Sequence, residues 1–254
     1  MLTGTRSEWL AWRLALTSFT LAALTGAFMR FGLYLGFPAG LRFTDVRHAH
    51  SHLMFFAWAT PALMLCAHAA LKSVGRRLPG GAALAVAAAV AGLLAYVPFL
   101  LSGYDLMRIG DAELPVSMMA SGLNGIVWYG FALLYLWGSR GVRRSTTLRL
   151  MDGAVAMLVI STVGVILLML ESMSGTATSA SVAANAEFYT SLFSDGWFGL
   201  GIVAGLALAY VPGRGGFGSI GPRWLGLATW SLVVGLTARS GARLLTHSQP
   251  EAGL

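Results

Sequence analysis

Residues 48–71 read HAHSHLMFFAWATPALMLCAHAAL, an apolar run that opens with three histidines. The part from Leu53 to Leu71 is close to the length of roughly 20 residues that a helix needs to cross a bilayer. His48, His50 and His52 are therefore expected where a membrane helix begins. Imidazole groups gathered at such a position are typical ligands of metal ions and heme.

The whole chain has the composition of a membrane protein. Its residues are 56% hydrophobic and 11% charged, which is too apolar for a soluble domain. Each apolar stretch of spanning length predicts one transmembrane helix, so we expect an all-α fold, a seven-helix bundle that forms a single membrane domain over residues 1–254. The predicted spans are residues 11–35, 49–71, 80–103, 115–137, 150–171, 188–211 and 223–243.

The positive charges predict how this bundle is oriented. Lys72, Arg76 and Arg77 follow the second span and the basic segment Arg140–Arg149 follows the fourth, on the side of the amino terminus. Because basic loops favour the cytoplasm, the amino terminus is expected to be cytoplasmic, in the inner membrane of a bacterium or an archaeon. The net charge of +7 is spread over helix ends, which indicates a lipid bilayer as partner and no nucleic acid. Residues 173–186, rich in Ser, Thr and Ala, are expected to form the longest extracytoplasmic loop.

With this orientation, the histidines share the extracytoplasmic side with several carboxylates. Asp195 is the leading acid, because it is expected roughly 12 Å along the sixth span, where a carboxylate is costly unless it is paired or protonated. Glu187 is expected on nearly the same helix face, and Glu171 ends the fifth span. Asp195, Glu171 and Glu187 are the candidate catalytic residues. The candidate metal ligands are His48, His50, His52 and Asp195.

Helical spacing limits what the histidines can do together. His48 and His52 are four residues apart and share a face, whereas His50 points about 160° away from both. Either the first helical turn is distorted, or the cluster serves two sites. In a first turn, the positive helix end would keep the imidazoles neutral and able to bind metal. Asp45, just before this turn, is expected as an amino-terminal cap more than as a ligand.

Residues 50–63, HSHLMFFAWATPAL, resemble one helix of a known family. His50, Met54, Phe56 and the Pro61–Leu63 triplet fall in register with the second transmembrane helix of subunit I of the heme-copper oxidase superfamily. The lead-in from Arg47 is similar to the nitric oxide reductase and cbb3-type branch. The resemblance implies that His50 is the axial ligand of a low-spin heme. The rest of the chain departs from the family, because it lacks the histidine-bearing tyrosine motif of the copper site, so a complete oxygen-reducing centre is not implied.

These observations favour a membrane redox protein, either an oxidoreductase or an electron-transfer protein. Its cofactor is expected to be heme b, copper or iron, bound on the extracytoplasmic side. Arg30, late in the first span, can pair with the outer acids or with a heme propionate. Quinol, which shares the bilayer, or a small redox protein is the expected partner, and the oligomeric state is left open. The candidate cofactor-binding residues are His50, Arg30, Arg47 and Met54.

Two other classes stay open. A zinc-dependent intramembrane hydrolase would use His48 and His52, with Asp195 or Glu171 completing the site and activating water. A membrane copper transporter would line an outer vestibule with His and Met, with His68 at the inner mouth. The role of His68 is not decided between these readings. A retinal protein is excluded, because the only lysine, Lys72, is not in the last span.

Overall fold

The computed structural model describes residues 4–210 and 222–247, and most of them are helical. The chain divides into two compact units, residues 1–138 and residues 139–254. Within the described ranges, six helices are long and apolar enough to cross a bilayer. The prediction of an all-α fold is therefore confirmed, and the six apolar helices are those expected of an integral membrane protein. The prediction of a single membrane domain stays a prediction, because the structure defines the two units separately and not their arrangement.

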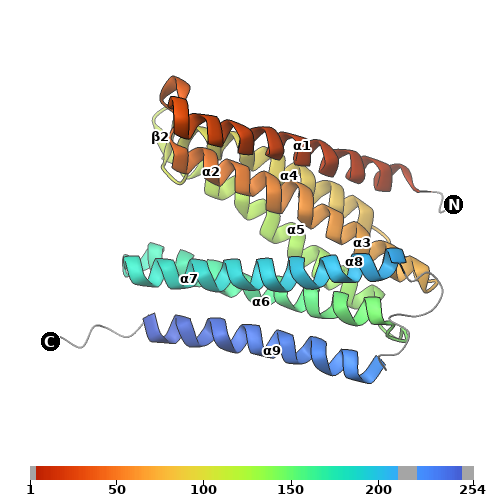
Figure 1. The fold of residues 1–254 in the computed structure, drawn as a ribbon. Coiled ribbons are helices and arrows are strands. Elements are labelled where there is room, and N and C mark those ends of the chain that lie inside the picture. Colours follow the sequence, from red (N-terminus) through yellow and green to blue (C-terminus); the bar gives the residue numbers. More distant parts are fainter. Residues whose placement is uncertain (1–3, 211–221, 248–254) are drawn as a thin grey trace. The chain divides into compact units, whose positions relative to one another are not determined.

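Unit 1, residues 1–138, contains four long helices (Figure 1). They are α1 (Arg6–Leu35), a continuous helix over Phe43–Ser73, α4 (Gly81–Ser102) and α5 (Val116–Gly138). The continuous helix consists of α2 (Phe43–His52), the π-helical segment η2 (Leu53–Ala59) and α3 (Thr60–Ser73). The segment between α1 and α2 contains η1 (Pro38–Gly40), and the segment between α4 and α5 contains a hairpin of β1 (Met107–Ile109) and β2 (Ala112–Leu114). We call the end with this hairpin the hairpin end, and the opposite end the N-terminal end.

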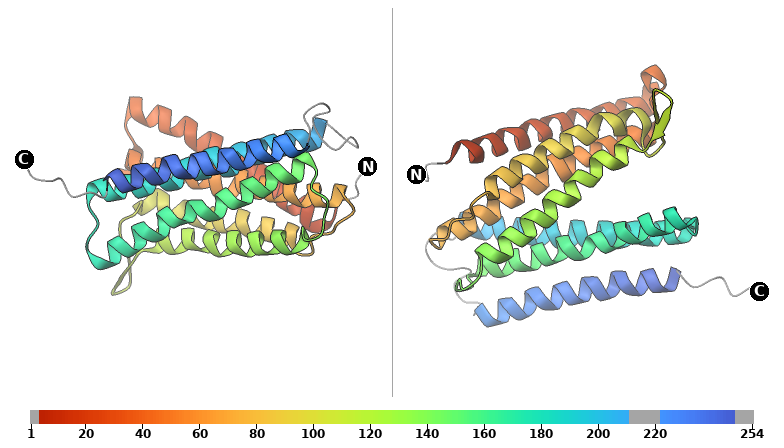
Figure 2. Two further views of the ribbon diagram at one scale, coloured as in Figure 1. Left: turned by 90° about the horizontal axis from the view of Figure 1, so that it is seen from below. Right: turned by 180° about the vertical axis from the view of Figure 1, so that it is seen from behind.

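Helix α4 is the centre of unit 1, since it contacts α1, α2, η2, α3 and α5. Figure 2 shows it beside α5. Its buried positions are nearly all alanine or glycine, which lets neighbouring helix backbones approach closely. One close approach is at Gly92, where an added Cβ would lie 2.6 Å from the backbone nitrogen of Ala57. Small residues on α4 therefore determine how tightly η2 packs.

The π-helical segment η2 has a local cause in Pro61. Proline has no N–H to donate, and its ring would clash with the carbonyl of the preceding turn. The chain relieves this clash by widening the helix before Pro61, and the N–H of Thr60 donates to the carbonyl of Phe55. Widened turns of this kind are common at functional sites. The histidines lie immediately before it, in the regular helix α2.

Unit 2, residues 139–254, contains three long helices that run alongside one another (Figure 1). They are α6 (Thr146–Ser174), a continuous helix from Ser179 to Tyr210, and α9 (Pro222–His247). The continuous helix consists of α7 (Ser179–Ser191), the π-helical segment η3 (Leu192–Leu200) and α8 (Gly201–Tyr210). Helix α6 contacts α7, η3, α8 and α9, so it has the central place in unit 2.

Each predicted span coincides with a helix, but several helices begin earlier than predicted, and the second and sixth differ most. The second begins at Phe43 and not at residue 49, and the sixth begins at Ser179 and not at residue 188. The predicted loop over residues 173–186 is therefore wrong. Thr178 and Ser181 form a capping box that starts the helix in this polar segment. Helix α9 has spanning length but is not among the six apolar helices, so the count of seven membrane spans stays a prediction.

The close contact at Gly92 gives a stability prediction. Gly92→Ala places a methyl group against the backbone of Ala57 and should destabilise the protein by about 1–3 kcal/mol, as overpacking does. Gly122→Ala on α5 is the matched control, because an added Cβ there meets nothing within 4 Å. Thermal unfolding of the two variants in detergent checks this, and equal melting temperatures would contradict the packing described for α4.

Candidate functional site

The three histidines lie in the second and third turns of α2, not in its first turn. The expectation that they feel the positive helix end is therefore wrong. Asp45 is also not a cap, because it is the third residue of α2. Its buried carboxylate accepts a hydrogen bond of 2.7 Å from Nε of Arg42. A second nitrogen of the same guanidinium, Nη2, donates to Asp105 at 2.6 Å. These bonds raise the pKa of the Arg42 guanidinium and join two loops at the hairpin end.

His50 lies between α2 and α1. Its Nδ1 is 2.9 Å from the backbone carbonyl oxygen of Ala22. A carbonyl can only accept, so Nδ1 carries a proton, and in the neutral ring Nε2 then has the lone pair. An added Cβ at Gly26 would lie 3.0 Å from Cε1 of His50, so glycine at this position gives the ring its room. This is the arrangement by which proteins fix a metal-binding imidazole.

His52 is held inside unit 1 instead. Its Nδ1 donates to the carbonyl of His48 at 2.9 Å, and its Nε2 accepts from the hydroxyl of Ser121 at 3.0 Å. The ring stacks on Phe99 at a centroid distance of 3.8 Å and meets Phe56 edge-on at 4.7 Å. Both nitrogens are therefore occupied, and only 6% of the residue is exposed. In this structure His52 joins α2 to α4 and α5.

His48 is on the same side of α2 as His52, as the helical spacing predicts. Its ring lies 4.7 Å from Tyr104, edge-on, and 6.4 Å from Phe99. His50 faces α1, so the three rings do not meet at one point. Among the described residues, no group of three His, Cys, Asp or Glu side chains is placed to hold a metal ion. Of the three, His50 is the one with an open Nε2 and a fixed tautomer.

The other candidates of unit 1 lie on α1 and on the continuous helix that carries His50. Met54 packs against a cluster that includes Ala22 and Leu53. Arg30 is exposed on α1, one turn beyond Gly26. The guanidinium of Arg47, one turn before His50, lies 5.9 Å from the ring centre of Phe43. Neither arginine has an acidic partner among the residues that the structure describes.

The carboxylates of unit 2 have three different environments. Glu171 accepts a hydrogen bond of 3.1 Å from Nδ2 of the buried Asn185, and Glu187 pairs with Arg243 of α9. Asp195 is exposed in the π-helical segment η3. The widened turns begin between Glu187 and Asp195, so the regular spacing that predicted a shared face does not apply. Within unit 2 these three acids do not form a cluster.

Sequence reasoning missed a polar stripe on α5. Ser117 and Asn124 have no exposed surface, and the hydroxyl of Ser117 and both amide atoms of Asn124 have no partner among the described residues. Ser121 lies between them and bonds to His52. The signal was present, because spacings of four and three place these residues on one helix face. Buried polar side chains in a membrane helix commonly mark a functional region.

A second polar cluster occupies the N-terminal end of unit 1. The carboxylate of Glu8 lies 3.0 Å from Nε2 of His68 and 3.3 Å from Nζ of Lys72. It also accepts from the backbone N–H of Thr5 and so completes a capping box. His68 therefore helps to join α1 to α3, which is a structural role that its position alone did not indicate.

The comparisons with known proteins do not test the resemblance of residues 50–63. A scan against protein-family models, a search of the curated proteins and a search of the solved structures gave no match. The resemblance stays a prediction, and the function has to follow from the chemistry of the residues themselves.

The contacts of His52 give a prediction that separates it from a metal ligand. His52→Ala removes a buried stacked ring and should destabilise the protein by about 3–5 kcal/mol, the range for truncating a buried aromatic side chain. Ser121→Ala removes only one hydrogen bond and should cost about 1 kcal/mol. Chemical unfolding in detergent micelles checks both values. A His52→Ala variant as stable as the wild type would contradict the structural role.

Proposed function

We propose that the chain is a membrane heme protein that transfers electrons or oxidises and reduces a small molecule, with His50 as an axial ligand of the heme iron. The observation that carries this proposal is the 2.9 Å contact between Nδ1 of His50 and the carbonyl of Ala22. It fixes the tautomer whose Nε2 can bind iron, and it strengthens that nitrogen as a ligand. His50 is also the residue at which the resemblance to the heme-copper oxidases begins.

Heme fits the donor set around His50. Porphyrin nitrogens already hold the iron in the plane, so a single protein imidazole is enough to bind it. Copper, zinc or non-heme iron would need several protein ligands in one place. His50 would supply the protein nitrogen that holds the heme iron. When bound, heme b would provide the one-electron chemistry.

Arg30 and Arg47 are the residues that would meet the propionates. Each lies about one turn from the level of His50 toward the hairpin end, Arg30 on α1 and Arg47 on α2. Both are exposed. Guanidinium groups bind carboxylates through two parallel hydrogen bonds, so two unpaired arginines on neighbouring helices suit the two propionates of a heme. Met54, packed beside Ala22, would contribute an apolar wall.

The finer features of the proposal concern orientation and partners. Lys72, Arg76 and Arg77 at the N-terminal end favour a cytoplasmic amino terminus, and with it a heme site toward the extracytoplasmic side. We propose that α9 is the seventh span, since it has spanning length. Quinol is the proposed reductant, because it is soluble in the same bilayer. Asp195 is the proposed proton acceptor in unit 2, since an exposed acid midway along a membrane helix is costly unless it has a function.

Absorption spectroscopy of the purified protein tests this proposal. The wild type should show a Soret band, and His50→Ala should lose it because the iron has lost its ligand. His48→Ala is the matched control, two residues away on the opposite face of α2, and should keep the band. Gly26→Val should lower the heme content, because a side chain there displaces the His50 ring.

Elemental analysis completes this test. A colourless wild type that contains stoichiometric zinc would favour the hydrolase instead, and a metal-free protein that takes up copper into vesicles would favour the transporter. A Soret band of full intensity in the His50→Ala variant would show that another residue binds the heme.

A further inference from the structure

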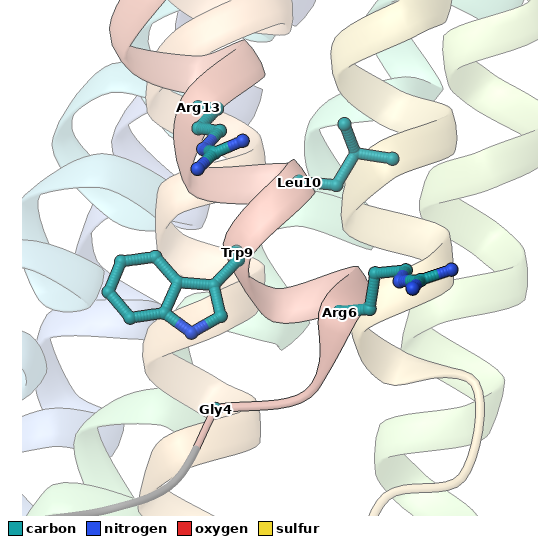
Figure 3. Close-up of a pocket in the computed structure, with 5 residues that line it drawn as sticks. All are labelled: Gly4, Arg6, Trp9, Leu10 and Arg13. Atoms are coloured by element: carbon teal, nitrogen blue, oxygen red, sulfur yellow. The ribbon is translucent and has the colours of Figure 1, made fainter.

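A cationic groove lies on the first two turns of α1, at the opposite end of unit 1 from Arg30 and the hairpin. We call it the α1 groove, and it is lined by Gly4, Arg6, Trp9, Leu10 and Arg13. Figure 3 shows Arg6 and Leu10 on one flank and Trp9 and Arg13 on the other, with the indole nitrogen directed toward Gly4. All four side chains come from one face of one helix.

The groove offers hydrogen-bond donors and no acidic partner. Arg6 and Arg13 are exposed, and neither forms a hydrogen bond or an ion pair with any residue that the structure describes. The nearest acid in sequence, Glu8, has its oxygens engaged elsewhere: Oε1 pairs with His68 and Lys72, and Oε2, beside Gly4, accepts from the backbone N–H of Thr5. The guanidinium groups and the indole N–H of Trp9 therefore present positive charge and donors to whatever fills the groove.

The same groove has an apolar wall that continues along the helix. Trp9 is 62% exposed, Leu10 is 46% exposed, and Leu16, seven residues after Trp9 on the same face, is 55% exposed. Residues seven apart lie above one another on a helix, so these side chains form a strip parallel to the α1 axis. Arg13 lies on this face between Trp9 and Leu16, so donors and apolar side chains are adjacent, as a ligand with a charged head and a hydrocarbon tail requires.

The groove is held in a defined shape by the rest of unit 1. The capping box of Thr5 and Glu8 fixes the first turn of α1 and already satisfies backbone donors there, so the groove is not simply a free helix terminus. The ion pairs of Glu8 fix the rotation of α1 against α3. An added Cβ at Gly4 would lie 3.1 Å from the indole nitrogen of Trp9 and 3.1 Å from Oε2 of Glu8, so glycine leaves room for both side chains.

We propose that the α1 groove binds an anionic phospholipid of the leaflet at the N-terminal end of unit 1. Arg6 and Arg13 bind the phosphodiester, because planar guanidinium groups match phosphate oxygens with paired hydrogen bonds. Trp9 lies at the level of the glycerol, as indole rings do at membrane interfaces, and an acyl chain follows Leu10 and Leu16. A free phosphate would leave the apolar strip unused. The site is separate from His50 and does not depend on the heme proposal.

Native mass spectrometry of the full-length protein in detergent tests this lipid site. Phosphatidylglycerol is the probe, phosphatidylcholine carries the same phosphate without net charge, and inorganic phosphate is the soluble competitor. Arg13→Gln should weaken phosphatidylglycerol binding about fivefold, and the Arg6→Gln/Arg13→Gln pair should weaken it about 25-fold. Arg77→Gln removes one exposed charge at the same end of unit 1, outside the groove, and should leave binding unchanged.

A second variant separates the lipid from a free anion. Trp9→Ser keeps both arginines but removes part of the apolar wall, so it should weaken phosphatidylglycerol and leave any phosphate binding unaffected. Circular dichroism confirms that each variant is folded. Equal phosphatidylglycerol binding by the wild type and the double arginine variant would overturn the proposal. Displacement of the lipid by inorganic phosphate at similar concentration would also overturn it, since the groove would then be an anion site only.

Discussion

The bilayer requires every backbone N–H and C=O group to find its partner inside the protein, and this constraint shapes both units. The chain satisfies this requirement with long continuous helices. Pro61 lacks an N–H donor, and the helix before it widens into η2, where the N–H of Thr60 donates to the carbonyl of Phe55, five residues back. A second widened segment, η3, contains Asp195. In both units the irregular turns are therefore adjacent to the titratable residues that the sequence singles out.

The same constraint explains why neighbouring histidines have different roles. An imidazole in an apolar environment needs partners for its nitrogens or a ligand to bind. Both ring nitrogens of His52 have hydrogen-bond partners, His48 and Ser121, so neither is free to bind a ligand in this structure. His50 has one nitrogen bonded to Ala22, and its other nitrogen is available. Two residues along one helix thus separate a structural histidine from a candidate heme ligand.

The sequence predicts the helices well and the contacts of the site only in part. Apolar length identifies every long helix, and helical spacing correctly separates His50 from His48 and His52. The early starts at Phe43 and Ser179 could not be predicted from apolar length, because polar residues begin both helices. Ser121, which bonds to His52, and His68, which pairs with Glu8, lie on other helices, 69 and 60 residues away, and only the packing of unit 1 brings these pairs together.

The central claim is that Nε2 of His50 binds heme iron. The most direct measurement is an anomalous-difference electron-density map, recorded at the iron absorption edge from crystals of the purified full-length protein. Heme bound as proposed would give an iron peak bonded to Nε2 of His50, with Nδ1 still donating to the carbonyl of Ala22. An iron peak bonded to other residues, or a fully loaded protein in which Nε2 of His50 bonds to another protein group, would contradict it.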